Sequence, residues 1–97
     1  MTDVTGWLFI VNPAGQAMVF HVDDSLVMPV FSEPERAGEY VARALGIAGV
    51  ALRPRVIEDG PGFLAMTLTR AIRLALDPIV DEEGTVCFDR FADEEPR

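Results

Sequence analysis

Lysine is absent from this chain of 97 residues, so arginine supplies all eight of its basic side chains. Sixteen acidic residues outweigh them and leave a net charge of −8 at pH 7. Non-specific binding to nucleic acids needs cations that replace the counterions at phosphates, and binding to anionic lipid surfaces needs them as well. The charge balance therefore argues against both nucleic acids and membranes as partners.

Cysteine and histidine each occur once, as Cys87 and His21. A single cysteine excludes a disulfide within the chain and favours a reducing compartment. We expect Cys87 to be a buried, inert thiol on an apolar strand. We expect His21 to be structural, because no cysteine or acidic residue stands at ligand spacing from it on its strand. The sequence therefore predicts no catalytic set, no metal site and no cofactor, and hence no enzyme.

Long apolar runs are also missing. The run at 7–11 is too short for a signal peptide or a membrane-spanning helix, and no basic residue precedes it. A cytoplasmic location follows by default. The length suits a single domain over residues 1–97, and we expect the acidic tail at 92–97 to be frayed.

Hydrophobic residues, in contrast, are abundant at 49% of the chain. A small monomer has little interior in which to bury so many, so we expect an apolar surface that a partner covers, most simply a second copy of the chain. Together with the acidity and the missing catalytic set, this excess predicts a non-enzymatic protein–protein interaction module that acts as a homodimer.

Alternating apolar residues predict three strands in the first half of the chain, at 7–11, 16–22 and 26–31, joined by short polar turns. Consecutive strands with short turns form a meander. Pro29 has no N–H to donate to a neighbouring strand, so we expect the third strand to be an edge strand or to end there.

A capped helix is predicted to follow directly, over 33–45. Ser32 and Glu35 stand at capping-box spacing, in which the serine oxygen accepts from the N–H of Glu35 and the glutamate carboxylate accepts from the N–H of Ser32. The residues that follow form one apolar stripe. Gly46 then supplies the left-handed residue that commonly ends a helix.

The segment after Asp59 fits two patterns. A helix from about 61 to 71, capped by Asp59 and extended to 75, is the first interpretation, because its apolar residues recur at helical spacing. The alternative is a shorter helix followed by a strand at 72–76, because apolar residues also alternate there. Further strands are predicted at 50–58 and 85–91. The expected fold is α+β, a mostly antiparallel sheet of four or five strands with two helices packed on one face.

One stretch resembles a known family. The run at 26–37 is similar to the "(aliphatic)-Pro-Val-Phe-Thr-Ser-x-Glu-x-Ala" step of SseB-type N-terminal domains, which are small bacterial α/β domains. The residues that match best are Pro29, Val30, Phe31, Ser32 and Glu35. The resemblance implies no catalytic residues and a module that takes part in protein association. The later run at 74–78 resembles that family's strand ending in Asn-Pro or Asp-Pro, which favours the strand at 72–76.

Four arginines are the candidate ligand site. Arg53 and Arg55 share a strand face, and Arg70 and Arg73 share a helix face. If the two pairs converge, they can bind an anion or an acidic peptide bidentately, with N–H groups added by the glycine-rich segment 59–62. Otherwise they are surface side chains paired with acidic neighbours. A small-ligand or anion-binding protein is therefore the alternative function.

Overall fold

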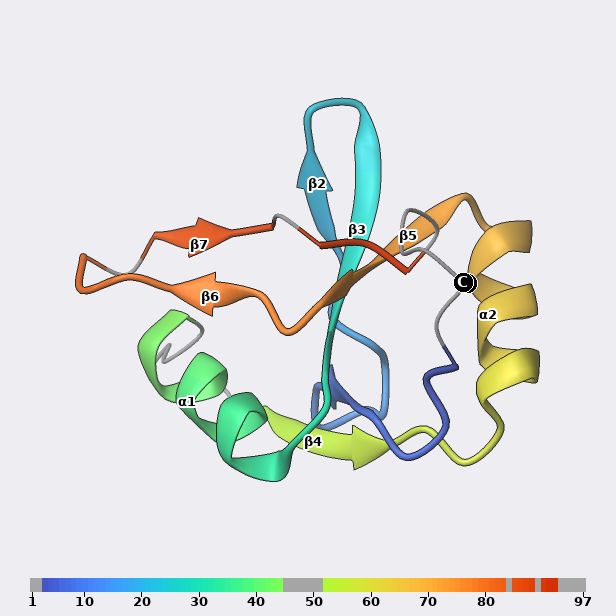
Figure 1. Cartoon of the computed structure of the whole chain (residues 1–97), viewed down its shortest axis with the longest axis horizontal. Helices are drawn as coiled ribbons and strands as arrows, with labels where there is room; N and C mark the ends of the chain where they lie inside the picture. Colours follow the sequence, from blue (N-terminus) through green and yellow to red (C-terminus); the bar gives the residue numbers. More distant parts are fainter. Residues whose placement is uncertain (1–2, 45–51, 84, 89, 93–97) are drawn as a thin grey trace.

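The computed structural model describes residues 3–44, 52–83, 85–88 and 90–92 (Figure 1). Within them the chain forms two helices and seven strands. The predicted end of the first helix at Gly46, the start of the strand at 50 and the tail after Ala92 lie outside the described residues. The elements are β1 (Leu8–Val11), β2 (Phe20–Val22), β3 (Ser25–Phe31), α1 (Pro34–Ala44), β4 (Arg53–Val56), α2 (Gly60–Thr69), β5 (Ile72–Leu76), β6 (Ile79–Val80) and β7 (Val86–Cys87).

The main sheet is built on β3. β2 pairs antiparallel with the first three residues of β3, β1 pairs antiparallel with its last two, and β5 runs parallel to it from Leu26 to Val30. β4 then adds antiparallel to β1. The result is a five-stranded, mostly antiparallel sheet, and the α+β class is confirmed.

Pro29 lies inside the most extensively paired strand, so the expectation of an edge strand or a strand end is wrong. The carbonyl of Val30 accepts from the N–H of Asp77, at the end of β5. The backbone of the preceding residue, Pro29, therefore faces the other side of β3. On that side β2 pairs up to Val27 and β1 pairs from Val30. The missing N–H of Pro29 falls where the partner strand changes, so it leaves no ladder bond unmade.

The two helices cover opposite faces of the sheet, not one face as expected (Figure 1). Neighbouring strand residues point to opposite faces, and neighbours in β3 belong to different hydrophobic clusters. A strand that is apolar at every position from Leu26 to Phe31 needs cover on both sides. The cluster under α1 contains Leu8, Ile10, Phe31, Ala37 and Tyr40. The cluster beside α2 contains Met28, Val30, Ile57, Leu74 and Leu76, with Phe63 and Leu64 packed against it.

α2 ends at Thr69, and the strand at 72–76 is the correct alternative. Asp59 caps the helix as predicted, because its carboxylate accepts from the N–H of Gly62 at 3.1 Å. Ala71 then has a φ of 56°, which takes the chain out of the helix. The segment is a strand because this conformation buries both Leu74 and Leu76 in the cluster that contains Met28 and Val30 of β3.

Ser32 does not form the predicted capping box. Its N–H and its Oγ–H donate to the two carboxylate oxygens of Asp77, at 2.9 Å and 2.8 Å. Since Asp77 already accepts from the N–H of Ser32, this residue takes the role predicted for Glu35. The start of α1 is thus tied to the end of β5 across 45 residues of chain.

The chain after β5 forms a hairpin and then returns to the main sheet. β6 and β7 pair antiparallel, and the carboxylate of Asp81 accepts from the N–H groups of Glu83 and Thr85 in the turn. Backbone hydrogen bonds then tie Arg90 and Ala92 to β5. The strand predicted at 85–91 is therefore divided between this hairpin and the outer side of β5.

Candidate functional site

The four predicted arginines do not converge. Arg53 and Arg55 lie on β4 at one edge of the sheet, and Arg73 lies on β5. Val30 of β3 pairs with both β1 and β5, so the order across this part of the sheet is β4, β1, β3, β5. Three strand spacings, about 14 Å, therefore separate β4 from β5. Arg70 follows the end of α2, on the side of β5.

Each half of the arginine set has its own surroundings. The guanidinium carbon of Arg73 lies 3.9 Å from the ring centroid of Phe91, a cation–π contact. Arg53 and Arg55 are exposed and line a hollow of about 310 Å³ beside the turn at 12–15. Neither of these two side chains makes an ion pair or hydrogen bond within the described part of the chain.

The glycine-rich segment at 59–62 already uses its N–H groups. Gly62 donates to Asp59, and Gly60 donates to Oγ1 of Thr5 at 3.0 Å. Thr5 in turn donates its N–H and hydroxyl to Asp3, and these two bonds hold the pKa of the Asp3 carboxyl below its usual value. A Cβ at Gly60 would collide with Thr5 and Asp3. The segment therefore docks the N-terminal strand region instead of presenting free donors to a phosphate.

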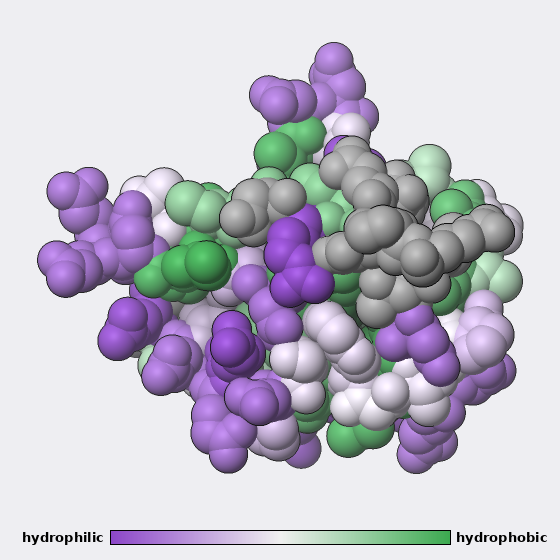
Figure 2. Space-filling model, viewed as in Figure 1, coloured by the Kyte–Doolittle hydropathy of each residue, from purple (hydrophilic) through white to green (hydrophobic). Residues whose placement is uncertain are grey.

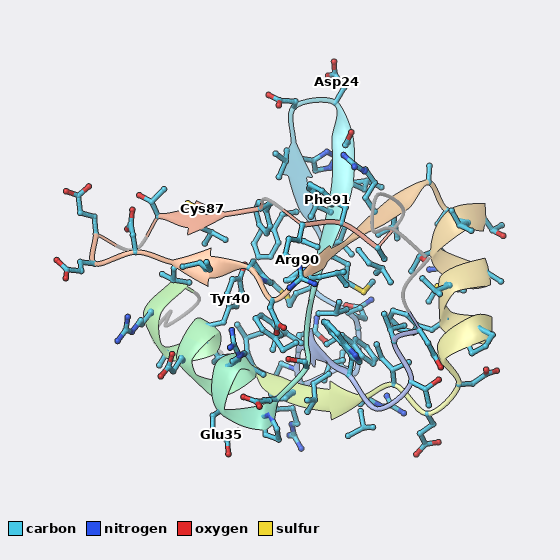
Figure 3. All side chains as sticks on the ribbon, in the orientation of Figure 1. Asp24, Glu35, Tyr40, Cys87, Arg90 and Phe91 are labelled. Carbon is cyan, nitrogen blue, oxygen red and sulfur yellow. The ribbon has the colours of Figure 1, made fainter. Side chains whose placement is uncertain are left out.

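Cys87 is exposed on β7, so the expectation of a buried thiol is wrong (Figure 3). β7 belongs to the small hairpin and not to the main sheet, which explains the difference. His21 is exposed on β2, opposite Leu26. Among the residues described, no group of three or more His, Cys, Asp or Glu side chains could hold a metal ion.

The most distinctive surface lies over α2. This helix has no charged side chain in its ten residues, although 25% of the whole chain is charged. Its exposed positions include Pro61, Ala65 and Leu68, which fall at i, i+4 and i+7 and so share one face. Leu68 is 57% exposed. In Figure 2 strongly hydrophilic residues gather over α1 and the β6–β7 turn, whereas the right-hand margin over α2 is mainly pale or green.

Two hollows flank α2. The one beside β5 measures about 330 Å³, and Leu64 and Leu68 of α2 line it together with Ile72. The one beside β4 measures about 440 Å³ and is lined by Phe63 and Met66 of α2. Val56, which is 52% exposed, also lines the second hollow. We call this region the α2 surface, with the members Val56, Phe63, Leu64, Ala65, Met66 and Leu68.

The α2 surface is not among the predicted site residues. Its signal in the sequence is the absence of charge between Asp59 and Arg70. Within the described residues, most large apolar side chains are accounted for by the two clusters on opposite faces of the sheet. The large hydrophobic residues that remain more than half exposed there are Val56, Leu68 and Ile79, and the first two lie on the α2 surface.

Comparisons with protein-family models, curated proteins and solved structures found no match to this chain. The resemblance to SseB-type N-terminal domains therefore stays a prediction. In the part of the chain that the structure describes, neither helix has the length and apolar character needed to cross a membrane.

Proposed function

We propose that this chain is a non-enzymatic protein-interaction module and that its contact surface is the α2 surface. The observation that supports the proposal is an exposed helix without charge in a protein of net charge −8. Exposed apolar patches of this kind commonly mark sites of protein association.

The energetics of association favour this face over the others. Burying a charged side chain requires removal of its water shell, a penalty that the outer face of α2 does not incur. Covering the exposed part of Leu68 contributes roughly 1 kcal/mol from apolar burial alone. The adjoining hollow of about 330 Å³ has room for an apolar side chain from the partner, which is the usual form of an interface anchor.

Two alanines provide a matched test. Ala65 in the middle of α2 and Ala42 in the last turn of α1 are both exposed, and the residue type changes in the same way at each. A glutamate costs slightly more at Ala42, near the negative end of the helix dipole, so any loss specific to Ala65→Glu does not come from helix stability. Ala65→Glu places a charge in the centre of the α2 surface, whereas Ala42→Glu adds one to a helix that is already charged. Both variants are used as bait, beside the unaltered chain, in an extract of the cells that make the protein.

The expected result is that proteins captured by the unaltered chain are kept by Ala42→Glu and lost by Ala65→Glu. Circular dichroism of the two variants checks that both remain folded. If both variants capture the same set of proteins as the unaltered chain, α2 is not the contact surface and the proposal is wrong.

A second candidate function is anion binding. Of the four predicted arginines, only Arg53 and Arg55 remain as candidates for this site. The observation that favours it is that both guanidinium groups are exposed, line one hollow and have no side-chain partner within the described residues. A pair of guanidinium groups of this kind can bind a phosphate or a carboxylate through several N–H donors.

Titration with inorganic phosphate, followed by amide chemical shifts, tests this second candidate. We expect shifts at 12–15 and 53–55 that disappear in Arg53→Gln/Arg55→Gln and persist in Arg70→Gln, the control on the other side of the sheet. Equal shifts in all three proteins would show that the shifts arise from non-specific electrostatic effects of phosphate and not from binding at Arg53 and Arg55.

A further inference from the structure

We infer that the partner on the α2 surface is a second copy of the same chain, and that the two α2 helices pack antiparallel about a two-fold axis near Ala65. This inference rests on the proposed function and specifies the partner. Three features of the described residues carry it: the charges along α2, the charges at its two ends, and the shape of the surface.

The middle of α2 is a face on which two acidic molecules can meet. A two-fold contact brings each residue near the axis against its own copy. α1 carries exposed charges of both signs, and a two-fold contact through its middle would set Glu39 against its own copy. Along α2 there is no charge to repeat. Like-charge repulsion at the centre of the contact is therefore smallest here.

The two ends of α2 carry charges of opposite sign. Glu58 and Asp59 precede the helix, and Arg70 follows it, and all three are exposed. When two copies pack antiparallel, the acidic end of each helix lies beside the basic end of the other. The ends are therefore complementary to themselves in this orientation, whereas a parallel arrangement would place like charges together. A strongly basic partner would lack this match, because the middle of the surface offers it no carboxylate.

The shape of the surface is also self-complementary. Leu68 protrudes at 57% exposure, and hollows flank α2 on both of its sides. A two-fold contact requires that one surface supply both the protruding side chain and the recess that receives it. Ala65 is small and lies at the middle of the ten-residue helix, so it allows the two helices to approach closely at the axis.

The first test measures mass in solution by light scattering. We expect the unaltered chain and Ala42→Glu to have the mass of two chains, with a dissociation constant in roughly the micromolar range, as for a weak contact between two small surfaces. Ala65→Glu sets two carboxylates against each other at the axis, and we expect it to be a single chain. A single-chain mass for the unaltered protein at concentrations well above that range overturns the inference.

A second test does not depend on loss of binding. In a Cys87→Ser background, Ala65→Cys places one thiol on each side of the axis, close enough for a disulfide across a close helix contact. We expect mild oxidation to link most of this variant into a covalent pair and to leave Ala42→Cys unlinked. Equal linking of the two variants, or none in either, contradicts the two-fold contact at Ala65.

A charge-reversal cycle tests the orientation. Glu58→Arg and Arg70→Glu each create two like-charge contacts in an antiparallel pair, and we expect each to weaken association about threefold to tenfold. The double variant restores opposite charges at both ends and is expected to regain most of the affinity. If the double variant is weaker than both single variants, the helices do not pack antiparallel.

These outcomes separate the inference from the function on which it rests. A single-chain mass combined with loss of other captured proteins in Ala65→Glu contradicts the second copy and leaves the α2 surface as the interaction site. Unchanged capture by Ala65→Glu contradicts the proposed function itself.

Discussion

α1 and α2 have nearly the same length, eleven and ten residues, and each covers one face of the same sheet, yet their outer faces differ completely. α1 exposes Glu35, Arg36, Glu39 and Arg43, and Arg36 lies 3.6 Å from the carboxylate of Glu33. α2 exposes no charge. A helix needs only one apolar stripe to hold its place on a sheet, so α2 has more apolar surface than the fold requires.

The inner faces of the two helices differ as well. α1 is anchored by Ala37 and Tyr40, which are 0% and 2% exposed. On α2 the corresponding apolar side chains, Phe63, Leu64 and Met66, are only half-buried. The main apolar side chains of α1 are thus buried deeply, whereas those of α2 are spread over the edges of the helix. We conclude that α1 serves the stability of the fold and that part of the apolar surface of α2 stays exposed.

The largest expected effect comes from removing the anchor of each helix. Tyr40 packs on Phe31 with ring centroids 5.1 Å apart, and Phe63 packs on Phe9 at the same distance. We expect Tyr40→Ala to lower the free energy of unfolding by about 3–5 kcal/mol, and Phe63→Ala by roughly half as much because Phe63 is not fully buried. Urea denaturation measures both, and equal losses would contradict the difference between the helices.

A smaller effect concerns the ionisation of Tyr40, the single tyrosine of the chain (Figure 3). Burial raises the pKa of Tyr40 from 10.0 to about 12. The unfolded chain therefore ionises at lower pH than the folded chain, and this favours unfolding above pH 10. The free energy of unfolding is unaffected below pH 10 and falls by about 2–3 kcal/mol as the pH rises to 12. Tyrosinate absorbance should therefore appear near pH 12 in the folded protein.

The unfolded chain in urea provides the control for this titration, with an expected midpoint near the ordinary value of 10.0. A midpoint near 10 in the folded protein would mean that the α1 face is open to water. The contrast between a deeply buried α1 and a half-exposed α2 would then be lost.

The smallest expected effect separates the two ways in which the helices are capped. α2 is capped by Asp59, its own neighbour, whereas Ser32, two residues before α1, is held by Asp77 from the end of β5. We expect Asp77→Asn to lower the free energy of unfolding by about 1 kcal/mol, because the amide can accept only one of the two bonds. Glu35→Gln should change it by less than about 0.5 kcal/mol. The reverse order would mean that the predicted capping box operates after all.

Local patterns predicted several elements well. The alternation at 26–31 identified β3, the proline and acidic residues after Ser32 identified the start of α1, and Asp59 was recognised as the cap of α2. Each of these signals acts between residues a few positions apart. Other predictions failed where the structure depends on residues far apart in the chain. The missing N–H of Pro29, for example, breaks no strand pairing only because β2 stops pairing with β3 before it and β1 starts after it.

The candidate site shows the same division. The exposed positions of Arg53 and Arg55 followed from their strand, but their separation from Arg73 depends on which strands lie between them. The exposure of Cys87 depends on β7 leaving the main sheet. The absence of charge in α2 is visible in the sequence, but its meaning depends on which side of that helix faces water.

By itself, the sequence of this protein determined the turns, the cap of α2, the alternation of β3 and the uncharged character of residues 60–69, because each depends on interactions between near neighbours in the chain. Only the tertiary structure decided that 72–76 joins β3 in parallel, that Asp77 holds Ser32 and that the helices take opposite faces. Those outcomes depend on which distant segments share a core, and the burial gained there outweighs the weaker local preferences.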